Sequence, residues 1–413
     1  MYCSDETGGI VVDIGSSSIK LGYGGEDVPK AVYPSSYGFN SQDPPTYYLG
    51  TQDLNTRRDQ MDVFSSFMNG KISNYDAIEK LLDYGITAGL RYKASEHPLL
   101  IVEDPFSFAE QRMKLAELMF EKLGFPAIYF IKSSSCIGWR FLICIILSFS
   151  LGKTTCMSVD FGASGIRVVP VYDGYPLMTA SAVSPYGGDY LNSLLFDKLS
   201  SQKIQVTPHC FLKKQIVEGV VANIQRIDFP NTRASFLKYA IMDIVRDMKE
   251  CCFHLASKPI KQSPPPTTPI SYTLPDNQEV HLDQDAYYIP EVIMTGNGTD
   301  EGPPLPNTIY SCIQNCDVEI RKELTSNIVL AGGGCCMKGL SARLDSELSS
   351  RLNASFKPKL YSSEPIYSPF NAWTGGSIIV GSSLGSFQQM WISKEEYKEK
   401  GREIISSRCN CRE

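Results

Sequence analysis

The same strand–turn–strand unit occurs in each half of this chain. In residues 11–27, VVDIGSSSIKLGYGGED, an apolar run ends at Asp13, a small hydroxyl-rich turn follows, and a second apolar run begins. Residues 154–175, TTCMSVDFGASGIRVVPVYDGY, repeat this order around Asp160. Apolar runs on either side of a glycine-containing turn predict two paired strands. Because the unit recurs in both halves, we predict a duplicated architecture with two lobes.

Both turns have the composition of a phosphate-binding loop. Glycine and serine let backbone amides approach and face an anion, and a lysine adds a cation. We expect Asp13 and Asp160 to face each other across a cleft, where two carboxylates with water suit Mg²⁺. One such turn is more often an ordinary hairpin, but two copies favour a nucleotide site. The candidate nucleotide-binding residues in the two turns are Asp13, Gly15, Ser16, Ser17, Ser18, Lys20, Asp160 and Gly162.

A third glycine cluster lies in residues 327–348, NIVLAGGGCCMKGLSARLDSEL. An apolar strand is expected to run into Gly332, Gly333 and Gly334, and leucines at helical spacing follow. A glycine turn at the start of a helix allows a purine or ribose to approach closely. Alone, this pattern is more often a plain strand-to-helix turn. Together with the two aspartate turns, it favours the adenosine side of a nucleotide site.

Composition narrows the classes of function. The 413 residues, 43% of them hydrophobic, suffice for two or three domain-sized units. A net charge of −6, with no basic run longer than a pair, argues against strong direct DNA binding. Thirteen cysteines without a Cys-x-x-Cys pair give no support for zinc and suggest free thiols in a reducing compartment. The apolar run 141–151 is too short to span a membrane, so no membrane partner is expected.

Longer passages resemble actin and the actin-related proteins over nearly the whole chain. The most specific is FNAWTGGSIIVGSSLGSFQQMWISKEEYKEKG, residues 370–401, and GYGGEDVPKAVYPSSYG and VYDGYPL are further matches. Within the family, PPTYYLGTQDLNTRRDQMD, SPYGGDYL and CDVEIRKELTSNIVLAGG are similar to the class of nuclear actin-related protein 4.

The resemblance implies the actin fold, which is an α/β fold with two ribonuclease-H-like lobes, a nucleotide cleft that holds ATP and Mg²⁺ between them, and small outer subdomains. The first lobe would comprise residues 1–153 and 366–413, with an outer subdomain at about 36–67. The second would comprise 154–365, with a helix-prone, charged outer subdomain at about 195–257. By position, the first aspartate turn matches the first phosphate loop and the second turn matches the second loop. Gly332 to Gly334 match the adenosine side, and Asp13 and Asp160 the metal side.

Departures from actin argue against ATP hydrolysis. Lys132 stands where actin has a glutamine that orients the attacking water, and Ala163 replaces an aspartate near the metal. A charged lysine cannot serve as a neutral amide, and both losses remove positioning that phosphoryl transfer requires. The lysine–glutamate pair that holds adenosine in actin is also not evident around 238–249. We therefore expect ATP binding with little or no hydrolysis. The short outer subdomain with Pro44-Pro45 argues against filaments.

The resemblance also implies partners and a location. It points to a nuclear structural subunit of chromatin remodelling and histone acetyltransferase complexes, with the cytoplasm as a further location. Monomeric actin would dock beside it on a helix of the large remodelling ATPase or acetyltransferase scaffold subunit, and histones are a further expected partner. The groove for that helix would lie near Tyr175, Leu384 and Phe387. The main alternative is a cytoskeletal actin-like ATPase; a sugar or acetate kinase is disfavoured by the C-terminal passage.

Two segments are longer than the family pattern. Residues 140–150, RFLICIILSFS, fall in the helix that hinges the lobes, and residues 377–387 lie beside the groove. The first segment is either an error in the gene structure or a real insertion that packs its apolar face on the protein or a partner.

Overall fold

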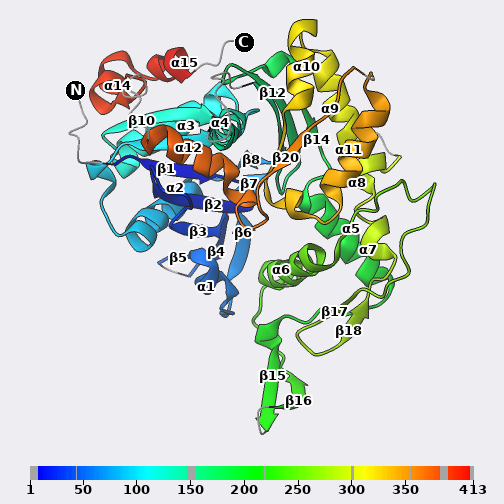
Figure 1. The fold of residues 1–413 in the computed structure, drawn as a ribbon. Coiled ribbons are helices and arrows are strands. Elements are labelled where there is room, and N and C mark those ends of the chain that lie inside the picture. Colours follow the sequence, from blue (N-terminus) through cyan, green and yellow to red (C-terminus); the bar gives the residue numbers. More distant parts are fainter. Residues whose placement is uncertain are drawn as a thin grey trace.

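Two lobes, each built on a six-stranded sheet, lie side by side in the computed structural model (Figure 1). The second lobe (green to yellow) follows the first (blue to cyan) along the chain, and the C-terminal segment (red) returns to the first lobe. The structure describes residues 8–42, 44–146, 155–217, 220–298, 302–353, 355–381 and 389–409. The α/β class implied by the resemblance to actin is confirmed.

The first sheet has the strand order β21-β10-β9-β1-β2-β3. β1 pairs with β2 in an antiparallel hairpin and with β9 in parallel, and β9 is also parallel to β10. Every residue of β9, LLIVE, is buried, as expected for a parallel strand covered on both faces. Its strands are β1 (Ile10–Ile14), β2 (Ser18–Tyr23), β3 (Ala31–Pro34), β9 (Leu99–Glu103), β10 (Ala127–Lys132) and β21 (Ile392–Ser393).

The second sheet repeats this plan. Its path is β13-β12-β11-β19-β20, with β14 paired to β12. β11 and β12 form an antiparallel hairpin, and β11 is parallel to β19, as β1 is to β9. Its strands are β11 (Cys156–Phe161), β12 (Ile166–Tyr172), β13 (Tyr175–Pro176), β14 (Ala182–Ser184), β19 (Ile328–Ala331) and β20 (Leu360–Ser362). The duplication expected from the two aspartate turns is therefore present in the strand pairing.

Helices cover the sheets and join the lobes. α4 (Ser133–Ile146) packs against α12 (Asn371–Gly381), and a Cβ atom on Gly375 would lie 1.9 Å from the carbonyl oxygen of Cys136, so only glycine permits this approach. Other helices are α2 (Tyr75–Tyr84), α3 (Ala109–Glu117), α7 (Asp285–Tyr288), α8 (Val292–Thr295), α9 (Leu305–Gln314), α10 (Val318–Ser326), α11 (Leu340–Arg351), α14 (Lys394–Lys400) and α15 (Glu403–Cys409). None of the helices in the described ranges has the length and hydrophobicity that crossing a membrane requires.

The predicted outer subdomain near 36–67 falls on a three-stranded sheet and a short helix. These elements are β4 (Ser36–Asn40), β5 (Thr46–Tyr48), β6 (Asp62–Ser65) and α1 (Gly50–Asn55). The hairpin of β7 (Phe67–Met68) and β8 (Lys71–Ile72) follows, and its turn is Asn69-Gly70, with φ angles of 51° and 75°. Positive φ at both positions is the turn that an Asn-Gly pair favours between two strands.

The region near 195–257 is mixed rather than helical throughout. The helices α5 (Gly188–Ser201) and α6 (Ala234–Cys252) agree with the expectation, but β15 (Leu212–Val217) and β16 (Val220–Arg226) form a hairpin between them. This hairpin projects from the body of the molecule (Figure 1). Its valine and isoleucine content favours strands over the helix that the charges alone suggest. A smaller hairpin joins β17 (Ser271–Thr273) to β18 (Glu279–His281).

The two outer regions touch each other. Leu54, Met61 and Val63 share a buried apolar cluster with Phe211 and Phe236. The side chain of Arg57 donates to Thr232 at 3.0 Å, and Ser235 donates to Asp62 at 2.6 Å. The lobes are thus held together at their outer ends, and also by α4, which contacts β11, β12 and β19 of the second sheet. The lobe boundaries given from the sequence stay predictions.

The first surplus segment is only partly within the described residues. Arg140 donates to Asn371 and to the carbonyl of Tyr367, and the Phe141 ring lies 4.7 Å from that of Tyr361. The rest of that segment lies outside the residues whose side chains the structure describes, as does most of the second one. The choice between a gene-structure error and a real insertion stays open.

Candidate functional site

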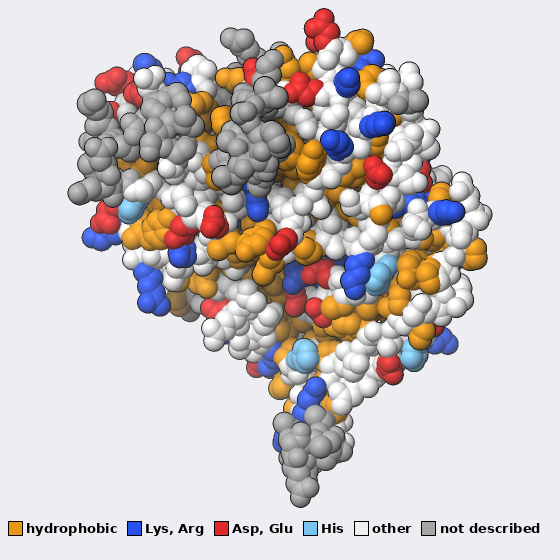
Figure 2. Space-filling view, viewed as in Figure 1, with side chains coloured by type: hydrophobic (Ala, Val, Ile, Leu, Met, Phe, Trp, Pro, Cys, Tyr) orange, Lys and Arg blue, Asp and Glu red, His pale blue; other side chains and the backbone are white. Residues whose placement is uncertain are grey.

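A cavity of about 670 Å³ lies between the lobes, where strands of both sheets end. Its volume is within the range of small-molecule sites. Figure 2 shows acidic and basic side chains gathered in the hollow at the centre of this face. The cavity is lined by every nucleotide-binding residue predicted from the sequence: Asp13, Gly15, Ser16, Ser17, Ser18, Lys20, Asp160, Gly162, Gly332, Gly333 and Gly334. Three segments far apart in the chain therefore meet at one place, and their role in binding stays a prediction.

The first turn is the connection between β1 and β2. Asp13 and Lys20 are paired across this hairpin, and their charged groups are 2.8 Å apart. The amide of Gly15 donates to the carbonyl of Ser18 at 3.2 Å, and a Cβ atom on Gly15 would lie 2.9 Å from that oxygen. Buried Ser35 then fixes the turn, because its hydroxyl donates to the Gly15 carbonyl and its amide donates to the Ser17 carbonyl. Hydrogen bonds within the protein thus hold the turn in this conformation.

The second turn connects β11 and β12 in the same register. Asp160 is paired with Arg167, and the amide of Gly162 donates to the carbonyl of Gly165 at 3.1 Å. Burial raises the pKa of the Asp160 carboxyl to about 6, while the positive charge of Arg167 works against this and the negative charge of Asp13 adds to it. The Asp160 carboxyl is therefore protonated more readily than a free aspartate, and a cation beside it would favour its charged form.

Asp13 and Asp160 are the predicted metal ligands. They line the same cavity, and the negative charge of Asp13 contributes to the raised pKa of Asp160. Within the described ranges no group of three or more histidine, cysteine, aspartate or glutamate side chains is arranged around a metal position. Two carboxylates nevertheless suit Mg²⁺, which keeps several waters and also takes phosphate oxygens. The metal stays a prediction.

The third turn follows β19 and shows which glycines packing requires. A Cβ atom on Gly332, where φ is 85°, would lie 2.5 Å from the carbonyl oxygen of Phe161, and one on Gly334 would lie 2.4 Å from the Phe161 ring. A Cβ atom on Gly333 would meet nothing within 4 Å, although Gly333 lines the cavity. Close packing thus explains why positions 332 and 334 must be glycine. Packing does not require glycine at position 333, which leaves open space that a ligand can enter. This open position fits a bound nucleotide.

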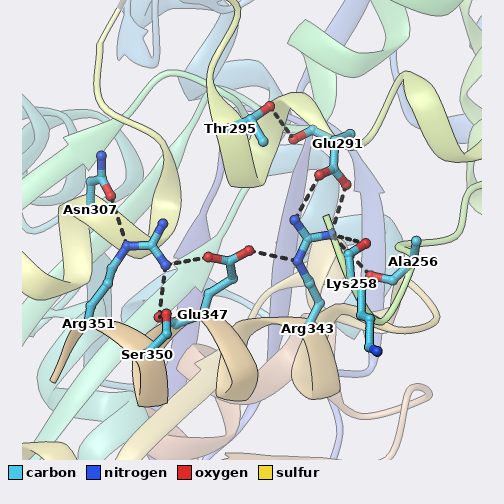
Figure 3. A network of polar contacts seen from close by, with 9 residues as sticks. All are labelled: Ala256, Lys258, Glu291, Thr295, Asn307, Arg343, Glu347, Ser350 and Arg351. Carbon is cyan, nitrogen blue, oxygen red and sulfur yellow. Dashed lines mark hydrogen bonds and ion pairs between the residues drawn. The ribbon is translucent and has the colours of Figure 1, made fainter. Parts of the chain in front are cut away.

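A buried ion network anchors the helix that follows this turn (Figure 3). Arg343 of α11 is fully buried and binds both carboxylate oxygens of Glu291, at 3.0 and 2.8 Å. Its remaining donors reach Glu347 and the carbonyls of Ala256 and Lys258. The segment after α6 and the start of α11 are therefore fixed to each other behind the cavity wall.

The structure corrects one expectation about α6. A lysine–glutamate pair is present in its last turn, because Lys249 and Glu250 both line the cavity. The Lys249 ammonium donates to the carbonyl of Gly188 at 3.2 Å, and burial lowers its pKa. Burial likewise raises the pKa of Asp189, which also lines the cavity. The sequence offered little signal for this pair, because only the tertiary fold brings the end of α6 to the cavity.

Of the two positions that depart from actin, Ala163 lies in the cavity wall and Lys132 lies behind Glu103, which lines the cavity. Ala163 lines the cavity and has no group that can hold a metal or water. Lys132 is buried at the end of β10, and its ammonium lies 3.0 Å from the Glu103 carboxylate. Arg112 binds the same carboxylate, so the Lys132 ammonium is held in a buried cluster of two cations and one carboxylate.

The predicted partner groove is only partly within the described residues. Tyr175 of β13 is 66% exposed. Leu384 and Phe387 lie outside the residues that the structure describes. The groove stays a prediction.

Comparison with known proteins gives consistent matches. The family model described as Actin matches residues 4–410. A protein of Arabidopsis thaliana named actin-related protein 4 is 34% identical over 454 aligned residues, covering 99% of this chain and 100% of the relative. Proteins of the same name are 33% identical in Oryza sativa subsp. indica and 30% identical in Schizosaccharomyces pombe, each over 99% of this chain.

Proposed function

The chain belongs to the actin family, and from this premise we propose that it is a non-polymerising nuclear actin-related protein. It serves as a structural subunit of chromatin remodelling and histone acetyltransferase complexes. It binds ATP with Mg²⁺ in the cleft between its lobes and hydrolyses it little or not at all. The names of its relatives, actin-related protein 4, support this class over actin itself.

One observation carries the nucleotide part of the proposal. Two aspartate turns in the same register and a glycine turn from a third segment line a single cavity between the lobes. Backbone amides and serine hydroxyls of the turns would hold phosphates, with Lys20 as counter-charge. Lys249 and Glu250 would lie on the adenosine side together with Gly333. A ligand held by both lobes stabilises their closed arrangement by mass action.

The proposed lack of turnover is supported by two replaced positions, Ala163 in the cavity wall and Lys132 at the end of β10. The ammonium of Lys132 is held by Glu103, so it offers no neutral amide to a water molecule. Ala163 offers no carboxylate. Hydrolysis of a phosphoanhydride depends on positioning of the attacking water and the metal, and both groups that provide it in actin are replaced.

The partner part of the proposal rests on the family and on one exposed residue. The side chain of Tyr175, on the edge strand β13 of the second sheet, is 66% exposed. An amphipathic helix of a large remodelling ATPase or acetyltransferase scaffold would dock at a groove there, with monomeric actin bound beside it on the same helix. Histones are the further partner we propose.

Affinity purification of the tagged full-length chain from its own cells tests this proposal. We expect actin, a large remodelling ATPase and acetyltransferase subunits in the purified material. Tyr175→Ala should reduce this recovery, whereas Tyr288→Ala, a similarly exposed tyrosine on α7, should not. Recovery of cytoskeletal proteins instead, together with filaments in sedimentation, would favour the alternative of a cytoskeletal actin-like ATPase.

A further inference from the structure

The register of the two aspartate hairpins places a basic residue at the same position in each. Residues 13–20, DIGSSSIK, and residues 160–167, DFGASGIR, have equal length. Asp13 pairs with Lys20 across the first hairpin, and Asp160 pairs with Arg167 across the second. Arg167 therefore holds in the second turn the position that Lys20 holds in the first.

The two basic residues differ in their present partners. Lys20 binds the aspartate of its own hairpin. Arg167 instead reaches across the cleft to Asp104, which follows β9 in the other lobe; its Nε and terminal nitrogen lie 2.8 and 2.7 Å from the same carboxylate oxygen. Both side chains are largely buried, with 13% and 28% exposed, and both line the cavity. This ion pair fastens one lobe to the other at the phosphate side of the cavity.

The guanidinium of Arg167 is held against the second turn by bonds that do not involve Asp104. It donates to the carbonyl of Gly165 and to the hydroxyl of Ser164, each at 2.9 Å. A Cβ atom on Gly162 would lie 3.2 Å from one of its nitrogens. The guanidinium thus lies directly beside a residue of the predicted phosphate loop.

Asp104 is also positioned without Arg167. Its second carboxylate oxygen accepts the amide of Phe106 at 2.8 Å, and its carbonyl accepts the amide of Ser107 at 3.0 Å. Either member of the pair can therefore change partner while both backbones stay in place. A planar guanidinium suits phosphate oxygens as well as it suits a carboxylate.

We propose that Arg167 is a phosphate-binding residue of this cleft, and that Asp104 is its partner when no nucleotide is bound. This inference rests on the proposed binding of ATP. Upon binding, the guanidinium passes from the carboxylate of Asp104 to the phosphate chain and keeps its contacts with Ser164 and Gly165. Asp104 then acts as a competitor, both for the guanidinium and by repelling the phosphates.

Calorimetric titration of Mg·ATP into the full-length chain tests the inference, because the two members of the pair should act in opposite directions. Arg167→Ala should weaken ATP binding about 10- to 100-fold, the range expected for a charge-assisted hydrogen bond. Asp104→Asn keeps a side-chain oxygen that can accept the amide of Phe106, and this variant should bind ATP as tightly as the wild type or more tightly. Lys198→Ala is the matched control, because it breaks the ion pair with Asp285, whose members do not line the cavity, and it should change nothing.

If Arg167→Ala and Asp104→Asn weaken ATP binding to the same extent, the inference is overturned, because the ion pair would then act only by holding the two lobes together. Unchanged affinity in Arg167→Ala would overturn it as well. Failure of the wild-type chain to bind ATP would remove the proposed nucleotide function and this inference together. If Arg167→Ala does not fold, Arg167→Gln, which keeps donors but no charge, should show the same loss of affinity.

Discussion

Replacing Arg343 with methionine should destabilise the chain strongly, although this residue contacts no expected ligand. The guanidinium is fully buried and makes five hydrogen bonds, two of them to Glu291 and two to backbone carbonyls. Methionine fills similar space but leaves the Glu291 carboxylate buried without its charge partner. Removing one member of a buried ion pair costs about 3–5 kcal/mol of unfolding free energy.

The matched control lies on the same helix. Arg351 is 30% exposed and pairs with Glu347, so Arg351→Met should cost less than about 1 kcal/mol. In the Arg343→Met background, Glu291→Gln removes the stranded charge and should recover roughly 1–2 kcal/mol. Urea unfolding followed by circular dichroism gives all three values. A loss in Arg343→Met no larger than that in Arg351→Met would refute the view that this network anchors α11 behind the cavity.

Three further predictions concern the cleft and the ion cluster around Glu103 in its wall. Gly333→Ala should keep the thermal unfolding midpoint but weaken ATP binding in calorimetry, because the new Cβ enters open space in the cavity. Gly334→Ala should lower the unfolding midpoint itself, because its Cβ would clash with the buried ring of Phe161. Burial raises the pKa of the Asp160 carboxyl to about 6, above the value of an unfolded aspartate. The protonated carboxyl therefore contributes its full stabilisation below about pH 4, and this contribution is lost as the pH rises through about 6. Asp160→Asn should remove this pH dependence from urea unfolding midpoints measured across that range. Arg112→Met should destabilise more than Lys132→Met in the same urea assay, because Arg112 gives two donors to the carboxylate that they share and also binds a backbone carbonyl.

The two aspartate turns were predictable because their signal is local. An apolar run, an aspartate, a glycine turn and a second run specify a hairpin within about 20 residues. Asp13 and Asp160 accordingly lie in equivalent hairpins and line one cavity. The glycine turn before α11 was predictable for the same reason.

What the sequence did not predict depends on contacts between distant segments. Lys249 faces the cavity because the fold brings the last turn of α6 to Gly188, a relation that helical spacing alone cannot supply. The pairing of Arg167 with Asp104 joins two lobes and has no local pattern. The hairpin at 212–226 differs from the helix-prone character expected for the whole region near 195–257, because its β-branched residues favour strands.

The nucleotide retained by the purified full-length chain tests the central claim most directly. The protein would be incubated with ATP and Mg²⁺, passed over a desalting column, held for several hours and denatured, and the released nucleotide would be separated by chromatography. Binding without turnover predicts that intact ATP is recovered, in an amount close to that of the protein. Recovery of ADP, or of no nucleotide at all, would contradict it.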